Sequence, residues 1–133
     1  MNERLYRLIL VVLGLYWLAI FIGTHLPPSA VRNVHVSDKL QHLVAYAILT
    51  VLLRLALGRV FRSAADWMTI SIVLAYGAVD EWLQPLVNRG AELADWFADA
   101  AGAAVGISLC GLLRLVYTRL LVRKSAVEEL AET

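Results

Sequence analysis

Residues that could do chemistry gather in two stretches of a chain that is otherwise strongly apolar. The first stretch carries Asp38, Lys39, His42 and Tyr46. The second carries Asp80, Glu81, Gln84, Arg89, Asp95 and Asp99. Ionisable side chains are costly to hold inside apolar segments, so their presence there indicates a functional site.

These residue types suit the recognition of an anionic headgroup. Arg89 can give two parallel hydrogen bonds to a phosphate or carboxylate, and Lys39 can add a point charge. The sequence therefore predicts a site for an anionic or phosphate-bearing headgroup, such as that of an anionic lipid. The residues expected to contact it are Asp38, Lys39, Tyr46, Gln84, Arg89 and Asp99.

Catalysis is a second interpretation of the same residues. Glu81 or His42 would act as general base beside Arg89, and Asp95 would orient the histidine. A metal site from His42, Asp95, Asp99 and Glu81 is chemically conceivable. Only one histidine lies among them, and His25 and His35 are expected in a solvent-exposed loop. We therefore expect no metal and no cofactor.

A third interpretation is structural. The polar residues could form a network that holds the helices together, in a non-catalytic structural or interaction protein. Their density of acids and bases counts against this, because polar contacts between membrane helices are normally made by Ser, Thr or Asn. Enzyme, lipid binder or flippase, and structural protein all stay open.

Composition indicates a single membrane domain over residues 1–133. Hydrophobic residues make up 60% of the chain, whereas soluble domains have about 45–50%. The net charge of +1 provides no field for a polyanion, so nucleic acid is not an expected partner. The single cysteine, Cys110, excludes an intramolecular disulfide.

The chain is predicted to form an all-α bundle of four transmembrane helices with a polar cluster at the outer-leaflet side. The helices are expected at about residues 5–23, 38–57, 65–84 and 93–122, followed by a cytoplasmic tail over 123–133. A polar loop is expected from Thr24 to Ser37, with helix-breaking prolines inside it. Ser37 is the predicted N-cap of the second helix, and Pro85 ends the third.

Two finer expectations concern helix faces. Asp80 and Glu81 are neighbours and should point about 100° apart on their helix. A stripe of small residues, Ala98, Gly102 and Gly106, should let another helix approach closely. That helix could belong to the same chain or to a second copy, so an oligomer through this stripe remains open.

The distribution of Lys and Arg predicts the orientation. Nine of the twelve lie near the two termini or between the second and third helices, and Arg32, Lys39 and Arg89 are the other three. Cytoplasmic loops carry the excess of Lys and Arg. Both termini are therefore expected in the cytoplasm.

The order and spacing of the polar residues resemble the VanZ-like family of small bacterial membrane proteins. The matching positions are Asp38, Lys39, His42, Tyr46, Glu81, Gln84, Arg89, Asp95, Gly102 and Gly106. One position departs from the pattern, because the family often has Asn where this chain has Asp99. The resemblance implies a place in the bacterial cytoplasmic membrane, a link to the cell envelope, and lowered susceptibility to the glycopeptide teicoplanin, without an agreed biochemical activity. With it, the expected function becomes recognition of an anionic lipid or lipid-linked wall intermediate at the outer leaflet, with its modification or redistribution as open alternatives.

Overall fold

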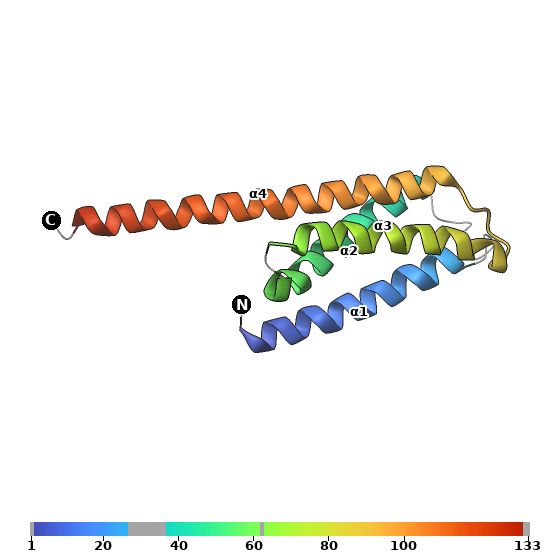
Figure 1. Ribbon diagram of the computed structural model, residues 1–133, viewed down its shortest axis with the longest axis horizontal. Helices are drawn as coiled ribbons and strands as arrows, with labels where there is room; N and C mark the ends of the chain where they lie inside the picture. The colour runs from blue at the N-terminus through green and yellow to red at the C-terminus, as the bar shows by residue number, and fades with distance from the viewer. Residues whose placement is uncertain (1, 27–36, 62, 132–133) are drawn as a thin grey trace.

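The computed structural model describes residues 2–26, 37–61 and 63–131 and shows an all-α bundle (Figure 1). Its elements are α1 (Glu3–His25), α2 (Asp38–Phe61), α3 (Ala65–Leu83), the short 3₁₀ helix η1 (Gln84–Val87) and α4 (Leu93–Ala131). No strand occurs among the described residues. The predicted fold class of four helices is confirmed.

Helix α1 is longer than the sequence predicted. Asn2 caps its start, with Oδ1 accepting the backbone N–H of Leu5 at 2.8 Å. The helix continues through Gly23 to His25, so Thr24 and His25 belong to its last turn and not to the predicted loop. Leu26 is extended, as expected for a residue that precedes a proline in the sequence. The remainder of the predicted loop, residues 27–36, lies outside the described residues.

Helix α2 begins where it was predicted. Ser37 caps it, with Oγ accepting the backbone N–H of Leu40 at 3.3 Å. Its end differs, because the helix passes through Gly58 and stops at Phe61. A glycine inside a helix costs only about 1 kcal/mol and need not end it when the neighbouring residues favour helix.

The connection from α3 to α4 is a tight turn that begins around Pro85, the predicted end of the third helix. Helix α3 ends at Leu83, Pro85 occupies the first turn of η1, and Asn88 closes that turn in the left-handed conformation with φ 58°. Helix α4 starts at the predicted Leu93 and continues to Ala131, past its predicted end near residue 122. Good helix formers, Ala, Glu and Leu, occupy much of that extension.

The helices alternate in direction, and the two ends of the chain lie toward the same end of the bundle (Figure 1). Helices α1 and α3 finish where α2 and α4 begin, so α2 and α4 run parallel to each other. Helix α4 extends well beyond the other three. Its residues from Gly111 to Lys124 are exposed.

The tightest packing joins α2 and α4. A Cβ at Gly102 would clash with the carbonyl oxygen of Leu43, and one at Gly106 would lie 2.7 Å from the carbonyl oxygen of Ala47. Both glycines of the predicted small-residue stripe therefore pack against a helix of the same chain. The buried apolar core is formed by Leu13, Ile20, Tyr46, Leu49, Leu53, Ala56, Val73 and Ala103.

Three helices in the described part of the chain are long and apolar enough to cross a membrane: α1, α2 and the Leu93–Lys124 part of α4. Large apolar side chains such as Leu15 and Leu18 face outward rather than into the bundle. Helix α3 has 19 residues and carries Asp66, Asp80 and Glu81, which separates it from the other three. The architecture is that of a helical membrane protein.

Candidate functional site

The polar side chains gather where α1 and α3 finish and α2 and α4 begin. We call this region the polar end; it consists of Thr24, His25, Asp38, Lys39, His42, Asp80, Glu81, Gln84, Arg89, Glu92, Asp95 and Asp99. Four of its carboxylates are buried, with exposed fractions of 1% at Asp80, 8% at Glu81, 3% at Asp95 and 0% at Asp99. Acidic side chains are almost never buried to this degree without partners.

The first set of partners joins α2 to α4. Lys39 Nζ donates to Asp95 Oδ1 at 3.3 Å and to Glu92 Oε2 at 3.1 Å. One turn further along both helices, His42 Nδ1 donates to Asp99 Oδ1 at 2.9 Å. Because the two helices run in the same direction, successive turns of α2 contact successive turns of α4.

This register corrects one prediction. Asp95 was expected to orient His42, but Asp99 does so, and Asp95 instead accepts a hydrogen bond from Lys39. The reason is the depth of each residue, since His42 lies one turn inside α2 and Asp99 lies one turn beyond Asp95 in α4. The position that departs from the VanZ-like pattern therefore holds the imidazole.

A second set of partners joins α1 to α3. Thr24 Oγ1 donates to Asp80 Oδ1 at 3.0 Å, and His25 Nδ1 lies 3.6 Å from the same oxygen. The His25 side chain is only 12% exposed. The prediction of a solvent-exposed His25 is wrong, because α1 carries this residue into the bundle. His35 lies outside the described residues.

Glu81 and Gln84 secure the connection into α4. Glu81 Oε1 accepts from Gln84 Nε2 at 3.0 Å, and Oε2 accepts from the backbone N–H of Glu92 at 2.9 Å. The side chain of Gln84 is itself buried. Asp80 and Glu81 face different helices, as the predicted divergence of about 100° requires.

Arg89 links the end of α1 to the start of α2. Its Nη1 donates to the carbonyl oxygen of Gly23 at 3.2 Å, and its Nη2 donates to Asp38 Oδ2 at 3.4 Å. A cation at the last carbonyl groups of a helix is favourable because the helix dipole is negative there. Part of the guanidinium is therefore already occupied within the chain.

A cavity of about 640 Å³ opens beside these residues, within the usual size range of ligand pockets, roughly 300–1,000 Å³. One wall is mostly apolar and includes Tyr16, Ala19, Ile20, Leu26 and Ala45. The facing wall is ionisable and includes Asp38, His42, Arg89, Glu92 and Asp95. The cavity therefore suits an amphipathic ligand, which has an apolar part and a charged part.

The structure sorts the predicted site residues by their relation to this cavity. Asp38, His42, Tyr46, Arg89 and Asp95 line it. Lys39, Glu81, Gln84 and Asp99 stand beside it and hold other residues of the polar end through hydrogen bonds.

The polar side chains that line the cavity and were missed as site residues are Tyr16, Thr24, Gln41 and Glu92. Tyr16 and Thr24 lie in the first helix, whose apolar pattern gave no sign that its inner face meets the site. Glu92 could have been found from its place beside Asp95 at the start of the fourth helix.

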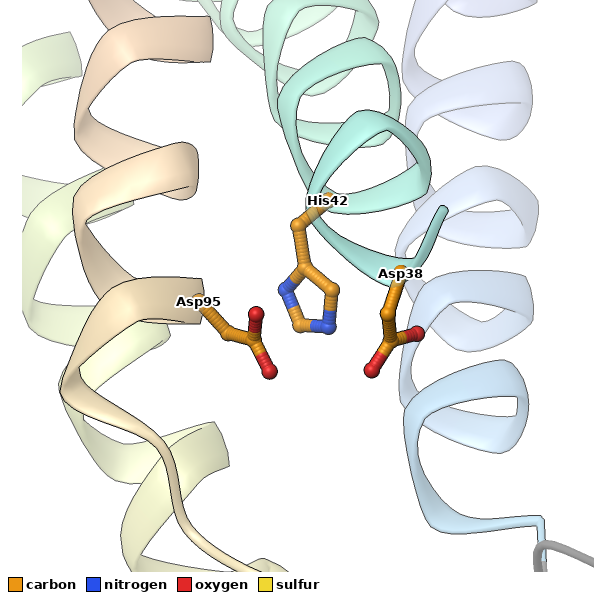
Figure 2. Close-up of side chains that lie close together, drawn as sticks. All are labelled: Asp38, His42 and Asp95. Atoms are coloured by element: carbon orange, nitrogen blue, oxygen red, sulfur yellow. The ribbon is translucent and has the colours of Figure 1, made fainter. Parts of the chain in front are cut away.

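Within the part of the chain that the structure describes, two groups of side chains could hold a metal ion. Asp38, His42 and Asp95 each offer one ligand atom, and these atoms lie within 4.8 Å of one another. Figure 2 shows the imidazole of His42 pointing between the carboxylates of Asp38, on the first turn of α2, and Asp95, on α4. The second group, His42, Glu81 and Asp99, meets the same distance limit but is fully buried.

No family model matches the chain, and searches of curated proteins and of solved structures find no match either. The resemblance to the VanZ-like family therefore rests on the motif residues alone.

Proposed function

We propose that this protein binds the phosphate-bearing headgroup of an envelope lipid, or of a lipid-linked wall intermediate, in the cavity at the polar end. One observation carries the proposal: a single cavity joins an apolar wall from α1 to an ionisable wall from α2 and the α3–α4 connection. A lipid has this division between acyl chain and headgroup. A small polar solute would not use the apolar wall.

The position of the cavity along the bundle supports the same ligand. Helix α1 has 23 residues and so spans about 35 Å, slightly more than the hydrocarbon core of a bilayer, about 30 Å. The ends of the helices then reach the level of the headgroups. The cavity lies at that level, beside the last turn of α1 and the first turn of α2.

The proposed orientation places the polar end at the outer leaflet of a bacterial cytoplasmic membrane, with both termini in the cytoplasm. Nine of the twelve Lys and Arg residues then fall on the cytoplasmic side. Because the two termini lie toward the same end of the bundle (Figure 1), α3 crosses the membrane as a fourth segment in this arrangement. A reporter fused after Thr133 should be active only in the cytoplasm; periplasmic activity would overturn the orientation.

In this proposal the protein has a VanZ-like role in the cell envelope, including lowered teicoplanin susceptibility. Arg89 lines the cavity and Lys39 stands at its edge, so both can approach a phosphate. His42 lines the cavity and Glu81 does not, so His42 is better placed than Glu81 to contact a ligand. Both oxygens of Glu81 already accept hydrogen bonds from Gln84 and Glu92.

The test is native mass spectrometry of the detergent-purified protein against a panel of envelope lipids that includes polyprenyl phosphates. We expect selective binding of a phosphate-bearing lipid by the wild type and its loss in Arg89→Ala. Arg59→Ala is the matched control, because Arg59 pairs with Glu3 at the opposite end of the bundle. Equal binding of every lipid by wild type and Arg89→Ala would contradict the proposal.

A second candidate function is structural, and the pattern of hydrogen bonds favours it. The contacts Thr24–Asp80, Lys39–Asp95 and His42–Asp99 each join two different helices. A purely structural protein should be destabilised by both Arg89→Ala and Glu81→Gln, with no ligand to lose. An enzyme should instead keep its fold and lose turnover in His42→Gln or Glu81→Gln. Folded, monodisperse Arg89→Ala and Glu81→Gln variants would count against the structural candidate.

A further inference from the structure

The polar end carries more carboxylates than cations. Its six carboxylates belong to Asp38, Asp80, Glu81, Glu92, Asp95 and Asp99. Its positive groups among the described residues are Lys39, Arg89 and, if protonated, His25 and His42. Six carboxyl groups thus face at most four cationic groups. Such a site favours a cation, and a phosphate would need one to bind there.

We propose that Asp38, His42 and Asp95 bind a divalent metal ion of the Mn²⁺ or Zn²⁺ type. Their ligand atoms lie within 4.8 Å of one another at the cavity wall. Two carboxylate oxygens and one imidazole nitrogen suit these ions better than soft copper(I) or an all-oxygen calcium site. Three protein ligands leave further coordination positions, which face the cavity.

Each of the three proposed ligands also makes a hydrogen bond to another residue of the polar end. Asp99 accepts the hydrogen bond from His42 Nδ1, which leaves Nε2 with its lone pair for the metal. Lys39 contacts Asp95 through Oδ1, and Oδ2 stays free of that bond. Arg89 contacts Asp38 through Oδ2, and Oδ1 stays free of it. Metal sites depend on this outer layer of hydrogen bonds to fix the orientation of their ligands.

A separate observation identifies a polar group without a partner next to one of these ligands, His42. Tyr46 is fully buried, lies one turn along α2 from His42 and lines the cavity. Its hydroxyl has no hydrogen-bond partner among the described residues. Buried hydroxyl groups normally have a partner. An oxygen of a metal-bound water or phosphate would supply one.

The metal ion also resolves the charge conflict of the proposed lipid site. It would offset the excess of carboxylates and use its free positions for phosphate oxygens. The metal site itself rests on the side-chain geometry alone, whereas the bridge from metal to lipid phosphate rests on the proposed function.

The first experiment measures Mn²⁺ binding to the lipid-free, detergent-purified full chain by electron paramagnetic resonance. We expect one Mn²⁺ per chain, displaced by Zn²⁺. Asp38→Asn should weaken binding at least about tenfold, because even loss of an outer-layer partner costs about 10–100-fold. The Asp38 side chain is 50% exposed, so the fold should tolerate this change. Glu3→Gln, an exposed acid at the opposite end, removes the same charge and should bind Mn²⁺ as the wild type does.

Two further variants keep the test decisive. His42→Gln removes the nitrogen ligand and should also abolish the site. Asp99→Asn keeps a hydrogen-bond acceptor beside the imidazole and should weaken Mn²⁺ binding by about 10–100-fold, since Asp99 acts as a positioning residue. Identical Mn²⁺ titrations of the wild type, Asp38→Asn and His42→Gln would overturn the proposal.

A second experiment separates the metal from the lipid. Native mass spectra are recorded with a polyprenyl phosphate in the presence and absence of EDTA, and with inorganic phosphate as competitor. Lipid binding that ignores EDTA, together with no Mn²⁺ binding, would overturn the metal site and leave the lipid function standing. Mn²⁺ binding without any lipid binding would support the metal site and overturn the proposed lipid function. Displacement of the lipid by inorganic phosphate at equal concentration would support the metal site and identify free phosphate as the ligand.

Discussion

The two ends of the bundle both carry ion pairs but use them differently. At the end that holds the amino terminus, Arg59 pairs with Glu3 and Arg54 pairs with Asp66, and each pair has a substantially exposed partner. At the polar end the pairs share members, and Asp80, Asp95 and Asp99 are buried. One end also carries most of the Lys and Arg of the chain, whereas the other carries an excess of carboxylates.

The difference shows that charge alone does not mark a functional site in this chain. Exposed pairs are worth about 0–1 kcal/mol and can be explained by membrane orientation and local pairing. Buried charged groups are costly, and they persist only where partners or ligands compensate for lost solvation. The cavity lies beside the buried groups. Variants that treat the two ends alike should therefore give unequal results.

The largest difference is expected between Asp99→Ala and Glu3→Ala. Asp99→Ala leaves the buried His42 without its acceptor and should lower the free energy of unfolding by about 3 kcal/mol. Glu3→Ala removes an exposed acid and should change it by about 1 kcal/mol or less. Unfolding by SDS in mixed micelles, followed by circular dichroism, measures both. Equal losses would show that the two ends are energetically alike.

The next effect concerns the packing that brings α2 and α4 together. Gly102→Ala places a methyl group against the carbonyl oxygen of Leu43 and should destabilise the protein by about 1–3 kcal/mol. Gly111→Ala, further along the same helix, meets nothing within 4 Å. It should be neutral or stabilise by up to about 1 kcal/mol. The same SDS titration compares them, and a stable Gly102→Ala variant would contradict the observed α2–α4 contact.

A smaller effect is expected from Thr24→Val. The change keeps the shape of the side chain but removes the donor to Asp80 Oδ1. Hydrogen bonds between membrane helices contribute about 1 kcal/mol, so the thermal midpoint in a fixed detergent should fall slightly. Thr118→Val is the control, because Thr118 is exposed and donates only within its own helix. If both variants melt like the wild type, α1 is not tied to Asp80.

The smallest effect is expected from Tyr16→Phe. Tyr16 donates to the carbonyl oxygen of Ala45 at 3.2 Å, and it also lines the cavity. Loss of this bond should cost only about 0.5 kcal/mol, the low end for a hydrogen bond, because the bond is only partly buried, while lipid binding through the ionisable wall persists. Tyr117→Phe, on the exposed part of α4, should have no effect on either measurement. Loss of lipid binding in Tyr16→Phe would move the headgroup contact to the α1 wall.

The sequence predicted the class of the fold and the beginnings of α2 and α4, because caps, prolines and apolar runs act locally. Helix ends were harder. Gly23 and Gly58 resemble stop signals, yet both lie inside helices, because a glycine ends a helix only when the following residues favour another conformation. This error at Gly23 hid Thr24 and His25 from the site.

The shared helix faces of the polar residues were predictable, whereas their pairing was not. Helical spacing places Asp38, His42 and Tyr46 on one face, and it places Asp95 and Asp99 on another. Whether His42 meets Asp95 or Asp99 depends on how far one helix is shifted along the other. The close approach at Gly102 sets that shift, and this contact between distant residues cannot be derived from spacing within either helix.

The stepwise pairing of α2 with α4 also bears on motion. A displacement of α4 by about one turn, roughly 5.4 Å, toward its own amino terminus would bring Asp99 opposite Lys39 and Ala103 opposite His42, and an alanine side chain cannot accept its hydrogen bond. Gly106 would take the place of Gly102, but Cys110 would take the place of Gly106, where a Cβ would lie 2.7 Å from the carbonyl oxygen of Ala47. Sliding of α4 along its own axis is therefore unfavourable. We expect a conformational change at the polar end to come from tilting or rotation of the helices, or from movement of α1.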